Sequence, residues 1–114
     1  MEKRIQSLGW AIQGIKTVWR EEVSFRIECF FSVCALGLGV YVHLSYIDWV
    51  IIILSISGLL AAEIINTAIE DVCNKIEPNY DPIIGKIKDI MAGFVLIVFA
   101  SGIIISMVIF WQYF

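Results

Sequence analysis

The chain has 114 residues, of which 60% are hydrophobic, and its formal net charge is −3. This length allows one domain at most, and the apolar content is far above that of a soluble domain. The first 28 residues carry nine charges and no apolar core segment, which argues against a signal peptide followed by a soluble protein. The net charge is uninformative about nucleic acid, but the lack of a basic patch argues against a nucleic-acid-binding protein.

Residues 2–20 have the pattern of an amphipathic helix. Apolar side chains recur at helical spacing, and polar side chains occupy the remaining positions. Two tryptophans, Trp10 and Trp19, suit the headgroup region of a bilayer. We therefore expect a helix that lies on the membrane surface and leads through a charged segment into the first span.

Three stretches contain no Asp, Glu, Lys or Arg, and two of them are long enough to cross about 30 Å of hydrocarbon. The middle stretch, Trp49–Ala62, is too short alone and must continue through the charged residues that follow it. The predicted spans are approximately residues 27–46, 49–72 and 87–112. The predicted fold class is therefore an all-α integral membrane protein with a surface helix and three transmembrane helices, within a single domain of residues 1–114.

All eight basic residues lie before the first predicted span or between the second and the third. The positive-inside rule then predicts a cytoplasmic N-terminus, a cytoplasmic loop at 74–89 and a C-terminus outside. Pro78 and Pro82 are expected to end the second helix and to shape this loop. The third long helix is expected to begin near Gly85–Lys88.

The second span carries polar side chains at Glu63, Asn66, Thr67 and Glu70. Offsets of 3, 4 and 7 residues place all four on one helix face. A charged side chain at the centre of a membrane helix costs about 2.5–3.5 kcal/mol on insertion scales, so this face indicates a buried polar site. Three spans cannot enclose the face on all sides, and we expect neighbouring copies of the chain to cover it.

No standard nucleotide-binding loop is present, because the one Gly-Lys pair is followed by Ile87 and lacks the glycine upstream. An enzyme would have to use carboxylates, with Lys88 as the phosphate partner. Glu22 and Glu70 are both expected near the cytoplasmic interface, where they would hold Mg²⁺. Glu63 lies about 10 Å deeper along the helix, within reach of a hydroxyl on a lipid and not of one on a soluble metabolite.

The run from Glu63 to Glu70, Glu-Ile-Ile-Asn-Thr-Ala-Ile-Glu, with Lys88-Asp89 eighteen residues on, resembles the prokaryotic diacylglycerol kinase family. That family includes the undecaprenol kinases of Gram-positive bacteria. The resemblance covers nearly the whole chain. It implies a multi-pass protein of the bacterial inner membrane that uses ATP and Mg²⁺ and forms a homotrimer with active sites between subunits.

The resemblance also implies roles for individual residues. Glu63 would be the catalytic base, with Asn66 as its neighbour, and Glu22 and Glu70 would be the metal ligands. Nucleotide contacts would come from Lys3, Trp10, Asn79, Tyr80, Asp81, Lys88 and Asp89. Contacts to the lipid substrate would come from Glu28, Glu63 and Ala92. One position departs from the family pattern, which usually has Asp where this chain has Asn74.

The expected reaction is phosphorylation of a lipid hydroxyl by ATP, with conversion of diacylglycerol to phosphatidic acid as the first candidate. Glu28 resembles the Gram-negative diacylglycerol kinases, whereas residues 66–68 and 91–93 lean toward the undecaprenol kinases, which leaves undecaprenol as the alternative. Two readings of another class also stay open: a small oligomeric ion or proton channel, and a structural polar network between subunits. Consumption of ATP that depends on lipid and Mg²⁺ separates an enzyme from both.

Overall fold

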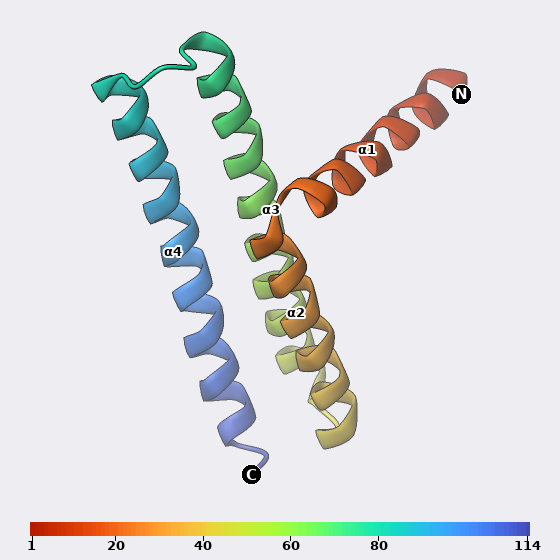
Figure 1. The fold of residues 1–114 in the computed structure, drawn as a ribbon. Coiled ribbons are helices and arrows are strands. Elements are labelled where there is room, and N and C mark those ends of the chain that lie inside the picture. The colour runs from red at the N-terminus through yellow and green to blue at the C-terminus, as the bar shows by residue number, and fades with distance from the viewer.

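Four helices contain nearly all of the chain in a computed structural model that describes residues 1–114 (Figure 1). The helices are α1 (Glu2–Glu21), α2 (Val23–Val42), α3 (Tyr46–Ile76) and α4 (Pro82–Trp111). By length and composition, α2, α3 and α4 are each able to cross a membrane. This confirms the all-helical fold class and the three long apolar helices expected from the sequence.

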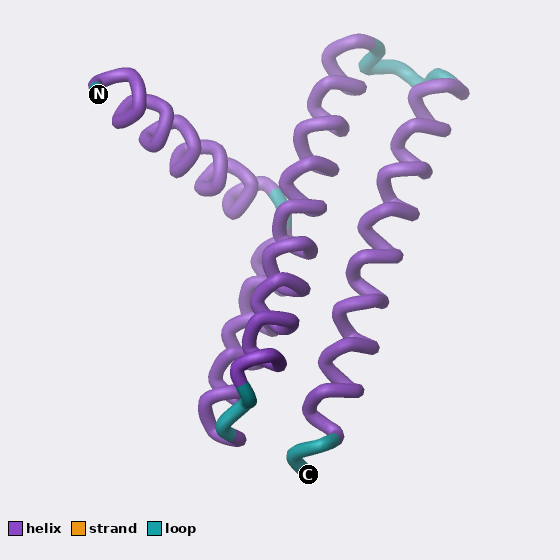
Figure 2. The backbone as a smooth tube through the Cα atoms, turned by 180° about the vertical axis from the view of Figure 1, so that it is seen from behind, coloured by secondary structure: helices purple, strands orange, loops and turns teal.

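The helices form an open bundle with one arm. α3 and α4 run side by side, and α2 packs along one half of α3 (Figures 1 and 2). α1 leaves the bundle at the α1–α2 junction, and its N-terminal end points away from the other helices. Only 12 of the 114 residues are buried, as expected for apolar helices whose outer faces meet a membrane.

The chain changes direction at a single residue between α1 and α2. Glu22 is extended, with φ −115° and ψ 111°. Arg26 Nη1 donates to the carbonyl oxygens of Trp19 and Arg20, at 2.9 and 3.3 Å, and so satisfies acceptors that the end of α1 leaves free. The Trp19 ring packs edge-on against Phe25, with ring centroids 6.5 Å apart. These contacts hold Glu22 at the corner between the two helices.

α2 ends earlier than the sequence predicts. His43 adopts the left-handed conformation with φ 58°, and the Leu44 amide donates to the Gly39 carbonyl at 3.1 Å, which closes the helix after Val42. The expected end near residue 46 is therefore wrong, and Tyr46 is instead the first residue of α3. Apolar character alone does not reveal this turn, because it depends on one residue with positive φ.

A polar clamp ties the end of α4 to the start of α3. The Tyr113 hydroxyl accepts from the backbone amide of Ser45 at 2.9 Å and donates to Asp48 Oδ2 at 2.7 Å. Ser45 Oγ accepts from the Asp48 amide and caps α3. A small buried core lies at the same end of the bundle and consists of Leu44, Ile52 and Ile109.

Gly39 allows a close approach in this region. A Cβ at Gly39 would lie 2.8 Å from Leu44 Cδ1 and 2.9 Å from Cη2 of Trp49, whereas a Cβ at Gly37 would meet nothing within 4 Å. We expect Gly39→Ala to lower the free energy of unfolding by about 1–3 kcal/mol, as overpacking typically does, and the matched control Gly37→Ala to change it little. Thermal unfolding of both variants in detergent micelles tests this expectation. Equal midpoints for the two variants would contradict it.

α4 begins at Pro82, so the predicted start near Gly85–Lys88 is wrong. Asp81 Oδ1 accepts hydrogen bonds from the backbone amides of Ile83 and Ile84, at 2.9 and 3.2 Å. Asp is a favoured N-cap, and proline is favoured in the first turn of a helix because it has no amide hydrogen to leave unpaired. Pro82 therefore starts α4 instead of belonging to the preceding turn.

Candidate active site

The polar face of α3 is formed as its spacing predicts. Glu63 and Thr67 are each only 4% exposed, whereas Asn66 and Glu70 are half-buried. The Thr67 hydroxyl donates to the backbone carbonyl of Glu63 at 2.9 Å, so the helix itself satisfies it. The single chain covers Glu63 and Thr67 unaided. The expectation that neighbouring copies must cover the whole face is therefore wrong for these two residues.

A second acid from α2 lies beside Glu63. Glu28 is 7% exposed, and its carboxyl group is close enough to that of Glu63 for the two to interact. Its Oε2 atom is buried without a hydrogen-bond partner in the chain. An unsatisfied buried polar atom costs about 1–3 kcal/mol, so this pair of acids is better explained by a ligand than by stability. The sequence marked Glu28 as an acid at the edge of an apolar run but gave no sign that it meets Glu63.

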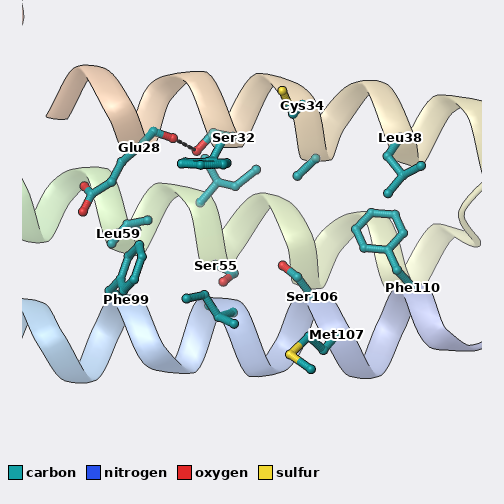
Figure 3. Close-up of a pocket in the computed structure, with 15 residues that line it drawn as sticks. Glu28, Ser32, Cys34, Leu38, Ser55, Leu59, Phe99, Ser106, Met107 and Phe110 are labelled. Carbon is teal, nitrogen blue, oxygen red and sulfur yellow. Dashed lines mark hydrogen bonds between the residues drawn. The ribbon is translucent and has the colours of Figure 1, made fainter. Parts of the chain in front are cut away.

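Glu28 lies at one end of an apolar groove between α2 and α4 (Figure 3). The groove has a volume of about 440 Å³, and α3 lies between its two walls. Leu38 and Phe110 lie at the opposite end. The Ser32 hydroxyl donates to the Glu28 carbonyl at 2.7 Å, which leaves the groove lining largely apolar. The volume is typical of ligand pockets, at about 300–1,000 Å³. The groove is not evident from the sequence, because three different helices contribute to it.

A smaller polar cavity lies between α3 and α4. Its volume is about 180 Å³, and it is lined by Asn66, Ile69, Glu70, Lys88, Met91 and Ala92. Lys88 Nζ donates to Asn74 Oδ1 at 2.8 Å, which ties this end of α4 to α3. Helix packing thus brings together four of the residues that the sequence singled out: Asn66, Glu70, Lys88 and Ala92.

Glu22, at the α1–α2 corner, belongs to the same acidic region. Partial burial raises its pKa, and the negative charges of Glu70 and Glu63 raise it further, with smaller effects from Glu21 and Asp71. A bound cation would relieve this repulsion. No three His, Cys, Asp or Glu residues are grouped so as to hold a metal alone. A pair of carboxylates suits Mg²⁺, which takes its other ligands from water and substrate phosphates.

The other predicted nucleotide-contacting residues lie outside the two cavities. Lys3 and Trp10 are on the exposed part of α1, whose N-terminal end points away from the bundle (Figure 1), so one chain does not bring them to its own acids. Asp81 accepts the hydrogen bonds that cap α4. The remaining three are exposed: Asn79, Tyr80 and Asp89.

This fold and site define a class of protein: a helical membrane protein with buried carboxylates at one depth and a cavity lined by both a lysine and a glutamate at another. The family model for prokaryotic diacylglycerol kinase matches residues 9–110, and the chain belongs to that family. It is 28% identical to the diacylglycerol kinase of Escherichia coli (strain K12) over 110 residues, which cover 96% of the chain and 90% of that protein. It is 33% identical to the undecaprenol kinase of Bacillus subtilis (strain 168) over 110 residues, or 96% of the chain and 89% of that protein.

The comparisons confirm the resemblance and the enzyme class that it implied. The chain is a lipid kinase with ATP as its co-substrate, and its three apolar helices and bacterial relatives indicate a bacterial membrane protein. A channel is not favoured, because the relatives are named as kinases.

Proposed function

We propose that the chain transfers the γ-phosphoryl group of Mg-ATP to the hydroxyl of a membrane lipid, with diacylglycerol as the first candidate. The observation that carries the proposal is the burial of Glu63 beside Glu28 at the end of the apolar groove. Asn66, Glu70 and Lys88 line a separate polar cavity farther along α3. A lipid hydroxyl and a phosphate chain would thus reach the same helix face from two sides.

In this mechanism Glu63 is the general base. Its carboxylate accepts the hydroxyl proton as the lipid oxygen bonds to the γ-phosphorus, and the bond from that phosphorus to the ADP oxygen breaks. Asn66, one turn along the same face, orients the reacting groups. Glu28 would accept a hydrogen bond from the lipid headgroup through its unpartnered oxygen. Ala92, expected from the sequence to contact the lipid, lines the polar cavity instead, where its small side chain would leave room for the reacting groups.

The nucleotide would lie at the other end of the polar face. Glu22 and Glu70 would hold Mg²⁺, which when bound offsets negative charge on the phosphates. Lys88 would contact the phosphates and Asp89 the ribose. Further contacts would come from the connection between α3 and α4, at Asn79, Tyr80 and Asp81.

Replacement of the two proposed metal ligands provides a direct test. We expect Glu22→Gln and Glu70→Gln each to weaken apparent Mg²⁺ affinity by at least about tenfold, and the double variant to lose less than the sum of the two effects, because ligands of one ion act as a unit. Magnesium titrations of ATP turnover measure this, with Glu21→Gln and Asp71→Asn as matched controls. Additive losses with unchanged metal dependence would argue against a shared ion.

The raised pKa of Glu22 also sets a pH dependence. Burial and the nearby negative charges raise the pKa of Glu22, so protons compete with Mg²⁺ for its carboxylate at a higher pH than they would at an ordinary glutamate. The apparent Mg²⁺ affinity should therefore fall as the pH is lowered toward this pKa, and magnesium titrations at several pH values should show a weaker fall in Glu22→Gln.

The proposal extends to the assembly of the chain and its orientation in the membrane. We propose a homotrimer, with the N-terminus and the 74–89 loop in the cytoplasm and the C-terminus outside. Residues 1–16 of the chain are all exposed, and α1 has large apolar side chains such as Ile5, Leu8 and Ile12 with little to pack against in one chain. A membrane surface and a neighbouring subunit would cover them. Lys3 and Trp10 would then reach the nucleotide of another copy.

The lipid substrate can be identified with two acceptors assayed side by side. The 33% identity to an undecaprenol kinase specifically supports undecaprenol as the second candidate. Purified protein in mixed micelles would be given Mg-ATP labelled at the γ-phosphate and either diacylglycerol or undecaprenol. We expect labelled phosphatidic acid to form faster. Faster labelling of undecaprenol would reverse the order of the candidates, and labelling of neither would overturn the proposed function.

A further inference from the structure

Lys88 is held in place by an uncharged partner. Its ammonium group has only donors, so the Asn74 atom 2.8 Å away must be the amide oxygen. Asn74 is exposed, and Lys88 is half-buried at the edge of the polar cavity that also contains Glu70. Asn74 lies four residues after Glu70 and eleven after Glu63, so it extends the polar face of α3 by one turn.

The chemistry of an amide differs from that of a carboxylate at this position. The amide oxygen orients the lysine without neutralising it, so the full positive charge stays available to an anion. The amide nitrogen supplies two further donors, whereas a carboxylate supplies none and repels phosphate oxygens. The Asn74–Lys88 pair therefore presents positive charge and donors only, apart from the oxygen that the lysine already occupies.

We propose that Asn74 is a positioning and specificity-determining residue for the phosphate chain of the nucleotide: it aims Lys88 at the polar cavity and adds its own amide donor to the same phosphate group. The inference rests on the proposed function for the identity of the anion. It assigns to this chain a phosphate-binding pair contributed by two helices, α3 and α4, instead of a lysine acting alone.

The test compares Asn74→Asp with Lys75→Gln. Both changes make the chain more negative by one charge at adjacent positions, but only the first creates an ion pair with Lys88. We expect Asn74→Asp to raise KM for ATP about tenfold, the size of one charge-assisted hydrogen bond, with kcat and the thermal midpoint nearly unchanged. Lys75→Gln should change KM less than twofold. Equilibrium binding of a non-hydrolysable ATP analogue should shift in parallel with KM.

A double-mutant cycle completes the experiment. Lys88→Gln should cost much less in the Asn74→Asp background than in the wild type, because the new carboxylate has already neutralised the lysine. An Asn74→Asp protein with wild-type KM and analogue binding, or with a loss equal to that of Lys75→Gln, would overturn the inference alone. Wild-type protein that binds the analogue but phosphorylates no lipid would overturn the proposed function alone, since the binding comparison still decides the role of Asn74. Absence of both binding and activity would overturn both.

Discussion

Glu63→Gln is expected to abolish turnover while leaving the fold and nucleotide binding largely intact. The substitution keeps the size of the side chain and removes only its ability to take a proton. Glu63 is 4% exposed, so water cannot readily replace it as the proton acceptor. Removal of a general base typically costs about 10²–10⁴-fold in rate. Initial rates at saturating ATP and lipid measure the loss, and analogue binding and the thermal midpoint show that the protein is otherwise preserved.

Asp71→Asn is the matched control for this prediction, because it removes an acid from the exposed side of the same helix. We expect it to retain nearly full activity. A Glu63→Gln protein with more than half of the wild-type rate would rule out Glu63 as the base. Glu28 would then be the next acid to test, since its carboxyl group lies beside that of Glu63.

Mixed oligomers are expected to recover activity when one chain lacks Glu63 and the other lacks Lys3 and Trp10. In one chain the acids at 22, 63 and 70 influence one another, whereas the N-terminal part of α1 points away from them. If α1 completes the site of a neighbour, a mixture of Glu63→Gln chains with Lys3→Ala/Trp10→Ala chains contains sites with both parts intact. Random assembly in a ring would make these about a quarter of all sites. Assays of co-reconstituted chains at limiting ATP measure the recovery.

The control mixture combines Glu63→Gln with Glu22→Gln. Because both residues belong to the acidic region of a single chain, this mixture should be no more active at limiting Mg²⁺ than the average of its two parents. Recovery in the control mixture and not in the α1 mixture would mean that Glu22 of one subunit shares a site with Glu63 of another. No recovery in either, with co-assembly shown by crosslinking, would place each site within one chain.

Features that depend on one helix alone could be predicted from the sequence. The face from Glu63 to Glu70 follows from the helical repeat, and the long apolar helices follow from hydropathy. The ends of the helices do not follow as directly, since α2 stops at a left-handed His43 and α4 starts at a proline behind an Asp cap. These are local backbone choices that average apolar content does not report.

Several contacts between helices could not be predicted from the sequence. The meeting of Glu28 with Glu63, the groove behind them and the Asn74–Lys88 bond each depend on how far one helix slides along another. A shift of a single turn, about 5.4 Å, would separate each pair without changing any pattern in the sequence. For these contacts the residue types were recognisable in advance, and the partners were not.

The length of α3 has a consequence for how the two substrates meet. Its 31 residues extend about 46 Å, whereas the hydrocarbon layer is about 30 Å thick and takes up about 20 of them. Counted from Asp48, hydrocarbon gives way to water near residue 68, about 8 Å past Glu63 and about 3 Å short of Glu70. α3 thus crosses the boundary between hydrocarbon and water as one continuous helix. In the proposed site, the lipid alcohol would react without leaving the hydrocarbon and ATP would react without leaving water, so only the phosphoryl group would cross the boundary between them.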